Sequence, residues 1–145
     1  MTRIDFYILP EPTQANGDTV NTVCRLCEKA AASGARVYLR VPQSELAEQI
    51  DGALWSYKEG GFLSHEIDTG KPSADPQPLI LIGNGEPPPT HHGILFNLGA
   101  DVPTYFSRFE RVLEIVPATV ADRSSSRERY KFYRDRGYEL KTHNL

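Results

Sequence analysis

The run Leu79-Ile80-Leu81-Ile82-Gly83 decides the fold class, because four consecutive apolar residues end at a glycine. A strand that is buried on both faces has this pattern, which is typical of a parallel sheet covered by helices. Ile94-Leu95-Phe96-Asn97-Leu98 is a second run of the same kind. We therefore expect a mainly parallel central sheet that contains both runs as inner strands.

The segments around these two runs alternate between strand and helix patterns. Strands are expected at 4–9, 36–41 and 111–116, and helices at 18–34, 44–55, 103–109 and 119–136. Asp18 and Ser44 are suitable N-caps, and Gly34 is a suitable stop after the first helix. This alternation predicts an α/β fold, with helices flanking the sheet and one domain spanning residues 1–145.

The composition excludes several classes of protein. The chain has 145 residues, of which 39% are hydrophobic and 24% are charged, as in an ordinary globular domain. A net charge of −3 disfavours a general nucleic-acid binder. No apolar run reaches the roughly eighteen residues of a membrane span, and the N-terminus lacks the pattern of a signal peptide. We therefore expect a cytoplasmic protein with no membrane partner.

Cys24 and Cys27 form a CxxC pair, which is the spacing of a redox motif or of half a zinc site. The chain has no second pair, and the adjacent His91 and His92 would point in different directions on a strand. Both cysteines also continue an apolar repeat of three and four residues along the first helix. We expect two buried core residues and no metal.

Motifs for nucleotide binding and catalysis are incomplete. Pro10-Glu11-Pro12 follows the first strand, at the position where a dinucleotide-binding fingerprint needs glycines. Asp68-Thr69-Gly70 spells the catalytic triplet of aspartic proteases, but it lies in a proline-rich segment instead of leaving an apolar strand. The sequence predicts no catalytic residue and no cofactor.

The C-terminal segment has a charge opposite to that of the rest of the chain. Residues 123–141 hold seven basic side chains against three acidic ones. Four residues at helical spacing share one face of the expected helix: Arg127, Tyr130, Lys131 and Arg134. Phe132 and Tyr133 lie on other sides and can pack inward. The shared face is either solvated surface or a site for an acidic ligand, with arginines for carboxylates and an aromatic wall.

Three stretches of the chain form a distinctive set: Phe6-Tyr7-Ile8-Leu9, then Leu54-Trp55 with Phe62 and His65, and then Arg127-Glu128-Arg129-Tyr130-Lys131-Phe132-Tyr133-Arg134 with Gly137. In their order and spacing they resemble the chi subunit family of bacterial DNA polymerase III. The resemblance spans nearly the whole chain, and the last stretch is the most specific. It implies a Rossmann-like fold without a nucleotide site, and a non-catalytic adaptor in the clamp-loader assembly.

The resemblance also implies two binding surfaces. One would hold the acidic C-terminal tail of single-stranded DNA-binding protein, which ends in phenylalanine after aspartates, through Arg127, Tyr130, Lys131, Val116 and Arg134. The other would bind the psi subunit of the clamp loader, or a helicase, through Trp55 and Phe62. By residue type alone these two aromatic residues belong in a core. The proline-rich segments 71–78 and 86–90 match no motif of the family.

Two other functions stay open at this point. A small enzyme that binds nucleotides or acids could use the same basic face on phosphate groups, and a thermal-shift screen with nucleotides would reveal it. Direct contact with DNA is the other possibility, but the net charge and the carboxylates interspersed in the basic segment count against it. The adaptor is the leading hypothesis, with no direct contact to nucleic acid.

Overall fold

The computed structural model describes residues 2–10, 17–56, 65–67, 79–88 and 90–145. Within these ranges seven strands form one sheet in the order β3-β4-β2-β5-β6-β1-β7, and each neighbouring pair is parallel. The strands are β1 (Arg3–Ile8), β2 (Val37–Arg40), β3 (His65–Ile67), β4 (Ile80–Gly83), β5 (Ile94–Asn97), β6 (Arg111–Val116) and β7 (Glu139–Asn144). The expected parallel α/β sheet is confirmed.

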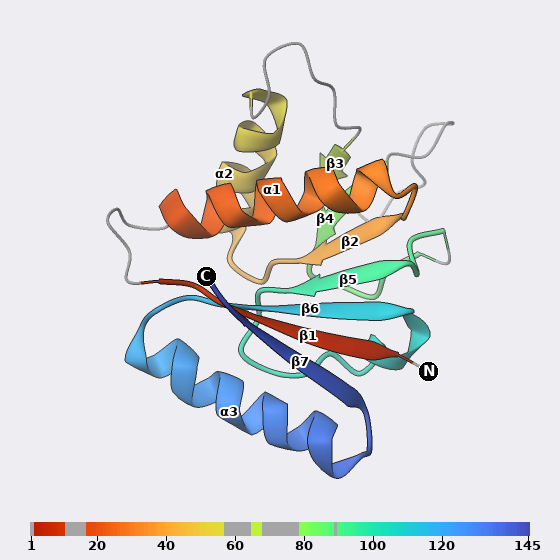
Figure 1. Cartoon of the computed structure of the whole chain (residues 1–145). Coiled ribbons are helices and arrows are strands. Elements are labelled where there is room, and N and C mark those ends of the chain that lie inside the picture. Colours follow the sequence, from red (N-terminus) through yellow and green to blue (C-terminus); the bar gives the residue numbers. More distant parts are fainter. Residues whose placement is uncertain (1, 11–16, 57–64, 68–78, 89) are drawn as a thin grey trace.

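Helices cover both faces of this sheet (Figure 1). α1 (Gly17–Ala32) and α2 (Ser44–Ser56) lie on one face, and α3 (Val120–Asp135) lies on the other. α1 and α2 join strands in the direction of β3, whereas α3 joins β6 to β7 in the opposite direction. Since crossovers between parallel strands are right-handed almost without exception, opposite directions place the helices on opposite faces.

Alternate residues of each strand point to opposite faces of the sheet and pack into two separate core layers. On β6, Leu113 and Ile115 pack toward α1 and α2, whereas Val112 packs toward α3. Cys24 and Cys27 are fully buried in the first layer, so the prediction that they are core residues is confirmed. Burial raises the pKa of the Cys24 thiol to about 11, which makes it a poor nucleophile.

Two strands and one helix differ from the expectations. β7 was not predicted, because its sequence ELKTHN is polar and most of its side chains are exposed at the sheet edge. β3 has only three residues, too few for a periodic signal. The helix expected at 103–109 is a single 3-10 turn, η1 (Phe106–Arg108), because Phe109 is already extended and buries its ring.

The turn after α3 brings β7 alongside β1. Gly137 has a φ of +80°, a conformation that side chains other than glycine rarely adopt. Its N–H donates to the carbonyl of Arg134, and the N–H of Tyr138 donates to the carbonyl of Tyr133. These bonds end the helix in a glycine C-cap. The chain then runs back as β7 between α3 and β1 in the view of Figure 1, and β7 pairs with β1.

Candidate functional site

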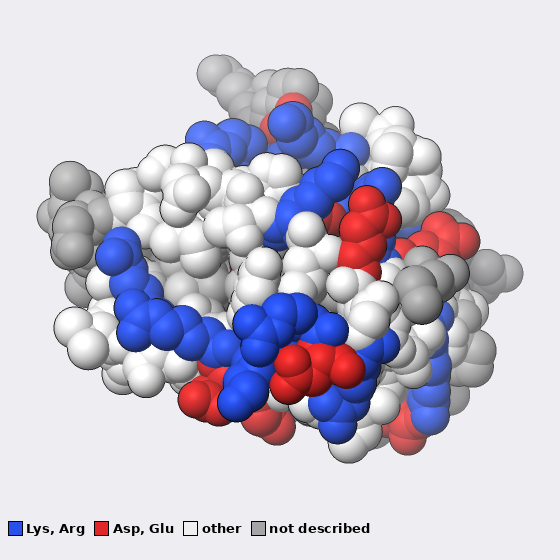
Figure 2. Space-filling view, turned by 60° about the horizontal axis from the view of Figure 1, so that its bottom comes forward, with Lys and Arg blue, Asp and Glu red and all other residues white. Residues whose placement is uncertain are grey.

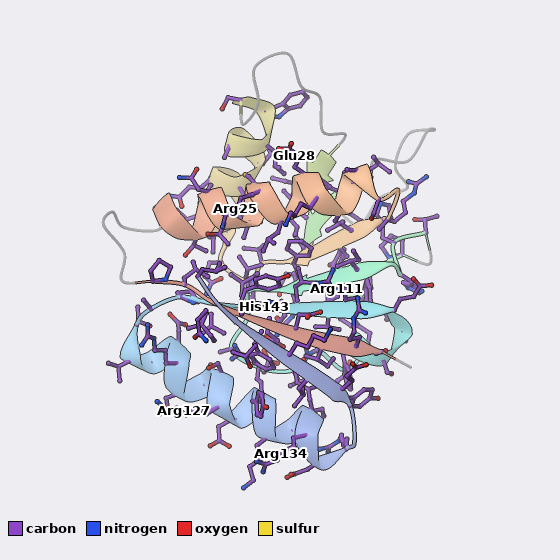
Figure 3. All side chains as sticks on the ribbon, in the orientation of Figure 1. Arg25, Glu28, Arg111, Arg127, Arg134 and His143 are labelled. Atoms are coloured by element: carbon purple, nitrogen blue, oxygen red, sulfur yellow. The ribbon has the colours of Figure 1, made fainter. Side chains whose placement is uncertain are left out.

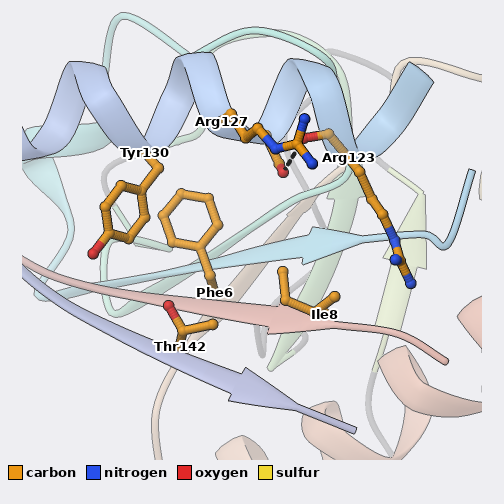
Figure 4. A pocket seen from close by; sticks show the side chains of 7 residues that line it. Phe6, Ile8, Arg123, Arg127, Tyr130 and Thr142 are labelled. Carbon is orange, nitrogen blue, oxygen red and sulfur yellow. Dashed lines mark hydrogen bonds between the residues drawn. The ribbon is translucent and has the colours of Figure 1, made fainter. Parts of the chain in front are cut away.

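A groove lies between α3 and the strands β1 and β7, with a cavity volume of about 240 Å³ (Figure 4). Three segments that are far apart in the sequence supply its walls: Phe6, Ile8, Arg123, Ser126, Arg127, Tyr130 and Thr142. The turn at Gly137 is what brings the third segment next to the first. The groove therefore exists only in the folded chain.

The floor of the groove is apolar and aromatic. Phe6 and Ile8 are two residues apart on β1, so their side chains point to the same face of the sheet. The Tyr130 ring stands next to the Phe6 ring, with 5.4 Å between the ring centroids (Figure 4). Tyr130 keeps 37% of its surface exposed. Phe6 is only 2% exposed, so a ligand with an apolar or aromatic group can bury that group mainly against Tyr130 and Ile8, above the Phe6 ring.

Two arginines stand on the α3 side of the groove. Arg123 and Arg127 are one helical turn apart and both line the cavity. No Asp or Glu among the described residues forms an ion pair with either of them. The Nε of Arg123 is buried, and it has no hydrogen-bond partner in the described parts of the chain. The exposed Arg127 side chain is therefore available to a carboxylate ligand, and the half-buried Arg123 lies one turn from it on the same wall.

The positive charge continues outside the groove. Figure 2 shows Lys and Arg side chains gathered along the side of the molecule that α3 occupies, with fewer Asp and Glu between them. Lys131 and Arg134 are exposed on α3 but do not line the cavity. Arg134 lies near the C-terminal end of the helix, with its guanidinium 3.3 Å from the Asp135 carboxylate (Figure 3).

Val116 occupies a different place from the other residues proposed for this surface. It is fully buried and pairs with Ile8 across β1 and β6, and it does not line the cavity. Ile8 and the partly exposed Tyr130 supply the apolar surface that the groove presents, and the buried Phe6 ring forms its base. The structure thus brings Arg127 and Tyr130 together in the groove, places Lys131 and Arg134 beside it, and buries Val116 within the core.

Sequence reasoning missed five of the lining residues, and the reasons differ. Arg123 precedes Arg127 by four residues, so extending the helical stripe back by one turn would have found it. Phe6 and Ile8 share a strand face, but nothing in the sequence says which helix covers that face. Thr142 had no signal, because β7 itself was not predicted. Ser126 is a small residue whose hydroxyl donates to the carbonyl of Arg123.

The inner side of α3 is buried, as expected for Tyr133, which has no exposed surface. Arg129 is also buried, although the sequence analysis counted it within the basic segment. Its Nε lies 2.8 Å from Oε1 of Glu114 on β6. Desolvation raises the pKa of Glu114, and the positive charge of Arg129 opposes that rise. α3 is therefore anchored to the sheet through a buried ion pair.

The second expected surface is described only in part. Trp55 stands at the C-terminal end of α2 with 63% of its surface exposed, which differs from the usual burial of tryptophan. Phe62 lies outside the described residues. Of the two aromatic residues expected at this surface, the structure describes only Trp55, and its indole is exposed.

A second cavity, of about 250 Å³, lies where nucleotides bind in many parallel α/β folds, at the carboxyl ends of the strands. Its lining includes Glu45 and Asp122, which stand in the first turns of α2 and α3. Helix N-termini attract anions through their free N–H groups. The carboxylates of Glu45 and Asp122 already supply negative charge at these two helix N-termini, and they would repel a phosphate group. This cavity therefore disfavours a bound phosphate.

The described parts of the chain carry no group of three or more His, Cys, Asp or Glu side chains that could hold a metal ion. None of the helices in those parts combines the length and the apolar character that crossing a membrane requires.

Comparisons with known proteins agree with this architecture. The family described as DNA polymerase III chi subunit, HolC, matches residues 1–141. A protein of Pseudomonas aeruginosa named DNA polymerase III subunit chi is 35% identical over 145 residues, covering 100% of this chain and 98% of its own length. A protein of the same name from Escherichia coli is 26% identical and covers 98% of this chain and 97% of its own length.

A solved structure of much lower identity has a similar fold. The crystal structure of T4 UvsW aligns with a TM-score of 0.64 at 9% sequence identity, over 99% of this chain and 42% of that one. At this identity the likeness concerns the fold alone.

Proposed function

Because the chain belongs to the DNA polymerase III chi subunit family, we propose that it is a non-catalytic adaptor of the replication machinery. In this proposal the groove between α3, β1 and β7 binds the acidic C-terminal tail of single-stranded DNA-binding protein. One observation carries it: two arginines without acidic partners in the described residues flank an aromatic floor. This pair of features fits an apolar residue that bears a free carboxylate.

The binding mode follows from the chemistry of each wall. The terminal phenylalanine of the tail packs against Tyr130 and Ile8, above the buried Phe6 ring, and its α-carboxylate accepts hydrogen bonds from Arg127 and Arg123. The aspartates that precede it lie along the exposed Lys131 and Arg134. Recognition of a chain terminus by such a site is a known mode of peptide binding.

Multivalency suits this interaction to an adaptor. A shallow groove that holds one aromatic residue and a few charges binds a single tail weakly, and exposed charge pairs are screened at physiological ionic strength. A DNA strand coated with binding protein displays many tails close together. A tail that dissociates is then replaced by a neighbour, so retention exceeds the affinity of one site.

A second surface would link the adaptor to the clamp loader. We propose that Trp55, together with Phe62, contacts the psi subunit or a helicase partner. The exposed indole of Trp55 supports this proposal, because tryptophan is among the residues that dominate protein interfaces. α2, which carries Trp55, and α3 lie on opposite faces of the sheet, so the two partners would not compete (Figure 1).

Fluorescence anisotropy with a labelled peptide ending in Asp-Asp-Ile-Pro-Phe tests the tail site, with the same peptide lacking its last residue as the comparison. We expect saturable binding that is lost without the terminal phenylalanine. Arg25→Ala is a matched control, because Arg25 is an exposed arginine on α1, on the opposite face of the sheet (Figure 3). Equal binding of both peptides would indicate a nonspecific basic surface and contradict the proposal.

A further inference from the structure

The inner face of α3 holds a charged group in a place that apolar residues usually fill. Arg129 is 4% exposed and Glu114 is fully buried. Besides the bond to Glu114, Nη1 of Arg129 donates to the carbonyl of Ala100 over 3.0 Å and to Oγ of Ser125 over 2.5 Å. One guanidinium thus joins β6, the segment after β5, and α3 itself.

Glu114 is held from several directions. Its Oε2 accepts a hydrogen bond from the Tyr133 hydroxyl over 2.6 Å, one turn after Arg129 on the same helix. Both carboxylate oxygens accept from Nδ2 of Asn97, which lies directly opposite on β5. Each of these groups acts as a donor, so the site is built for an ionised carboxylate.

Asn97 is itself immobilised. Its Oδ1 accepts from the backbone N–H of Gly99 over 3.0 Å and from Nη1 of Arg40 over 2.9 Å. Its Nδ2 also donates to the carbonyl of Asp101 over 3.0 Å. The acceptor that receives α3 is therefore fixed relative to the sheet before α3 contributes a bond.

Directional bonds on one side of a helix determine where its other sides point. Hydrophobic contacts are non-directional, whereas hydrogen bonds weaken steeply when their angle changes. Two anchors one turn apart, Arg129 and Tyr133, allow a single rotation of α3 about its axis. Tyr130 follows Arg129 directly, so that rotation determines whether Tyr130 stands over Phe6.

We propose that Arg129 is a positioning residue of the tail site: its bonds to Glu114, together with those of Tyr133, set the rotation of α3 that places Arg127 and Tyr130 around the groove. This inference rests on the proposed function of that groove. The preferred rotation of α3 that it requires can be observed in the ligand-free protein.

Stability and positioning can be separated by replacing the whole charged group. Substituting a buried ion pair by apolar residues of similar volume often leaves stability unchanged or raises it. A triple variant with Glu114→Leu, Arg129→Met and Tyr133→Phe removes the pair and also the hydroxyl that would lose its acceptor. Nδ2 of Asn97 loses Glu114 but keeps the carbonyl of Asp101 as an acceptor. The core stays filled, but the directional bonds are gone.

Three measurements on this variant test the proposal. We expect a folded protein that melts cooperatively, with a smaller loss of stability than Arg129→Ala causes, and about a tenfold loss in the preference for the peptide that keeps its terminal phenylalanine. We also expect NMR cross-peaks between the Phe6 and Tyr130 rings to weaken in the ligand-free variant. A folded variant with unchanged preference and unchanged cross-peaks would overturn the proposal.

If the triple variant does not fold, Arg129→Lys provides a second test of the proposal. Lysine retains the charge but lacks the planar fork that reaches Glu114 and Ala100 together. We expect a folded protein with weaker ring cross-peaks and reduced preference, and the original values for both would again overturn the proposal. If the original protein binds no tail peptide, the proposed function fails, and the ring cross-peaks of these variants still decide whether Arg129 positions α3.

Discussion

α3 carries an arginine and a tyrosine on each of two faces. The outer face holds Arg127 and Tyr130, which line the groove, and the inner face holds Arg129 and Tyr133, which are buried. Arg127 lines an open groove and has no acidic partner among the described residues, whereas Arg129, two positions later, is buried against Glu114. Tyr130 keeps part of its ring exposed beside Phe6, and Tyr133 is completely buried. Charge and aromaticity alone therefore do not mark a binding residue, because the direction of the side chain decides whether a ligand can reach it.

The protonation of Tyr133 reflects its place on the inner face of α3. Burial and the neighbouring Glu114 carboxylate raise the pKa of Tyr133 far above its ordinary value, so this hydroxyl stays a donor at every physiological pH. The inner face is therefore a permanent anchor, and the outer face is the part that a ligand can contact. Substitutions on the two faces should affect different properties.

The largest difference between the faces should appear in stability. Arg129→Ala leaves the Glu114 carboxylate buried without its cation, which should lower the free energy of unfolding by about 3–5 kcal/mol. Arg127→Ala removes an exposed side chain and should change it by no more than about 0.5 kcal/mol. Urea denaturation followed by circular dichroism measures both. Equal losses in the two variants would mean that the faces are not distinct.

The next effect concerns binding along the outer face. Arg127→Ala should weaken binding of the tail peptide by about tenfold, because a charge-assisted hydrogen bond inside the groove is lost. Lys131→Ala should weaken it only by about two- to threefold, since an exposed charge at the rim contributes little. Isothermal titration of both variants compares them. A stronger effect at Lys131 would place the ligand outside the groove.

The smallest effect concerns a buried carboxylate on the opposite face of the sheet. Burial pushes the pKa of Asp5 upward, but hydrogen bonds from Arg111 and His143 outweigh burial and hold that pKa below its ordinary value. A lowered pKa means that this stabilisation is complete above about pH 4 and is lost as the pH falls further.

Asp5→Asn tests this acid dependence. Because asparagine does not titrate, the variant should lose less stability than the original protein when the pH falls from about 5 to 3. Melting temperatures across that range give the comparison. Parallel curves for the two proteins would show that Asp5 does not contribute to acid unfolding.

The sheet could be predicted because its inner strands are continuous apolar runs, such as Leu79-Ile80-Leu81-Ile82, which carry their own signal. β7 could not, because an exposed edge strand has little apolar surface to bury and its sequence resembles a loop. The segment 103–109 was expected to be helical, but only Phe106–Arg108 forms a 3-10 turn, because the backbone is already extended at Phe109.

The sequence could predict only those residues of the candidate site that lie close together along the chain. Arg127 and Tyr130 lie on one helix face, and the spacing of three residues is enough to associate them. Phe6, Ile8 and Thr142 join them through the pairing of β1 with β7, which no local pattern reveals. Arg129 fits the basic composition of the segment, and only the position of Glu114 on β6 makes it a core residue.

Chemical-shift mapping by NMR, with the tail peptide titrated into isotope-labelled protein, shows directly whether the groove between α3, β1 and β7 binds the tail. We predict that the largest shifts fall on Phe6, Ile8, Arg123, Arg127, Tyr130 and Thr142, and that the peptide lacking its terminal phenylalanine produces none of them at the same concentration. Shifts centred instead on the cavity at the carboxyl ends of the strands, around Thr19 and Leu98, would contradict the assignment of the groove.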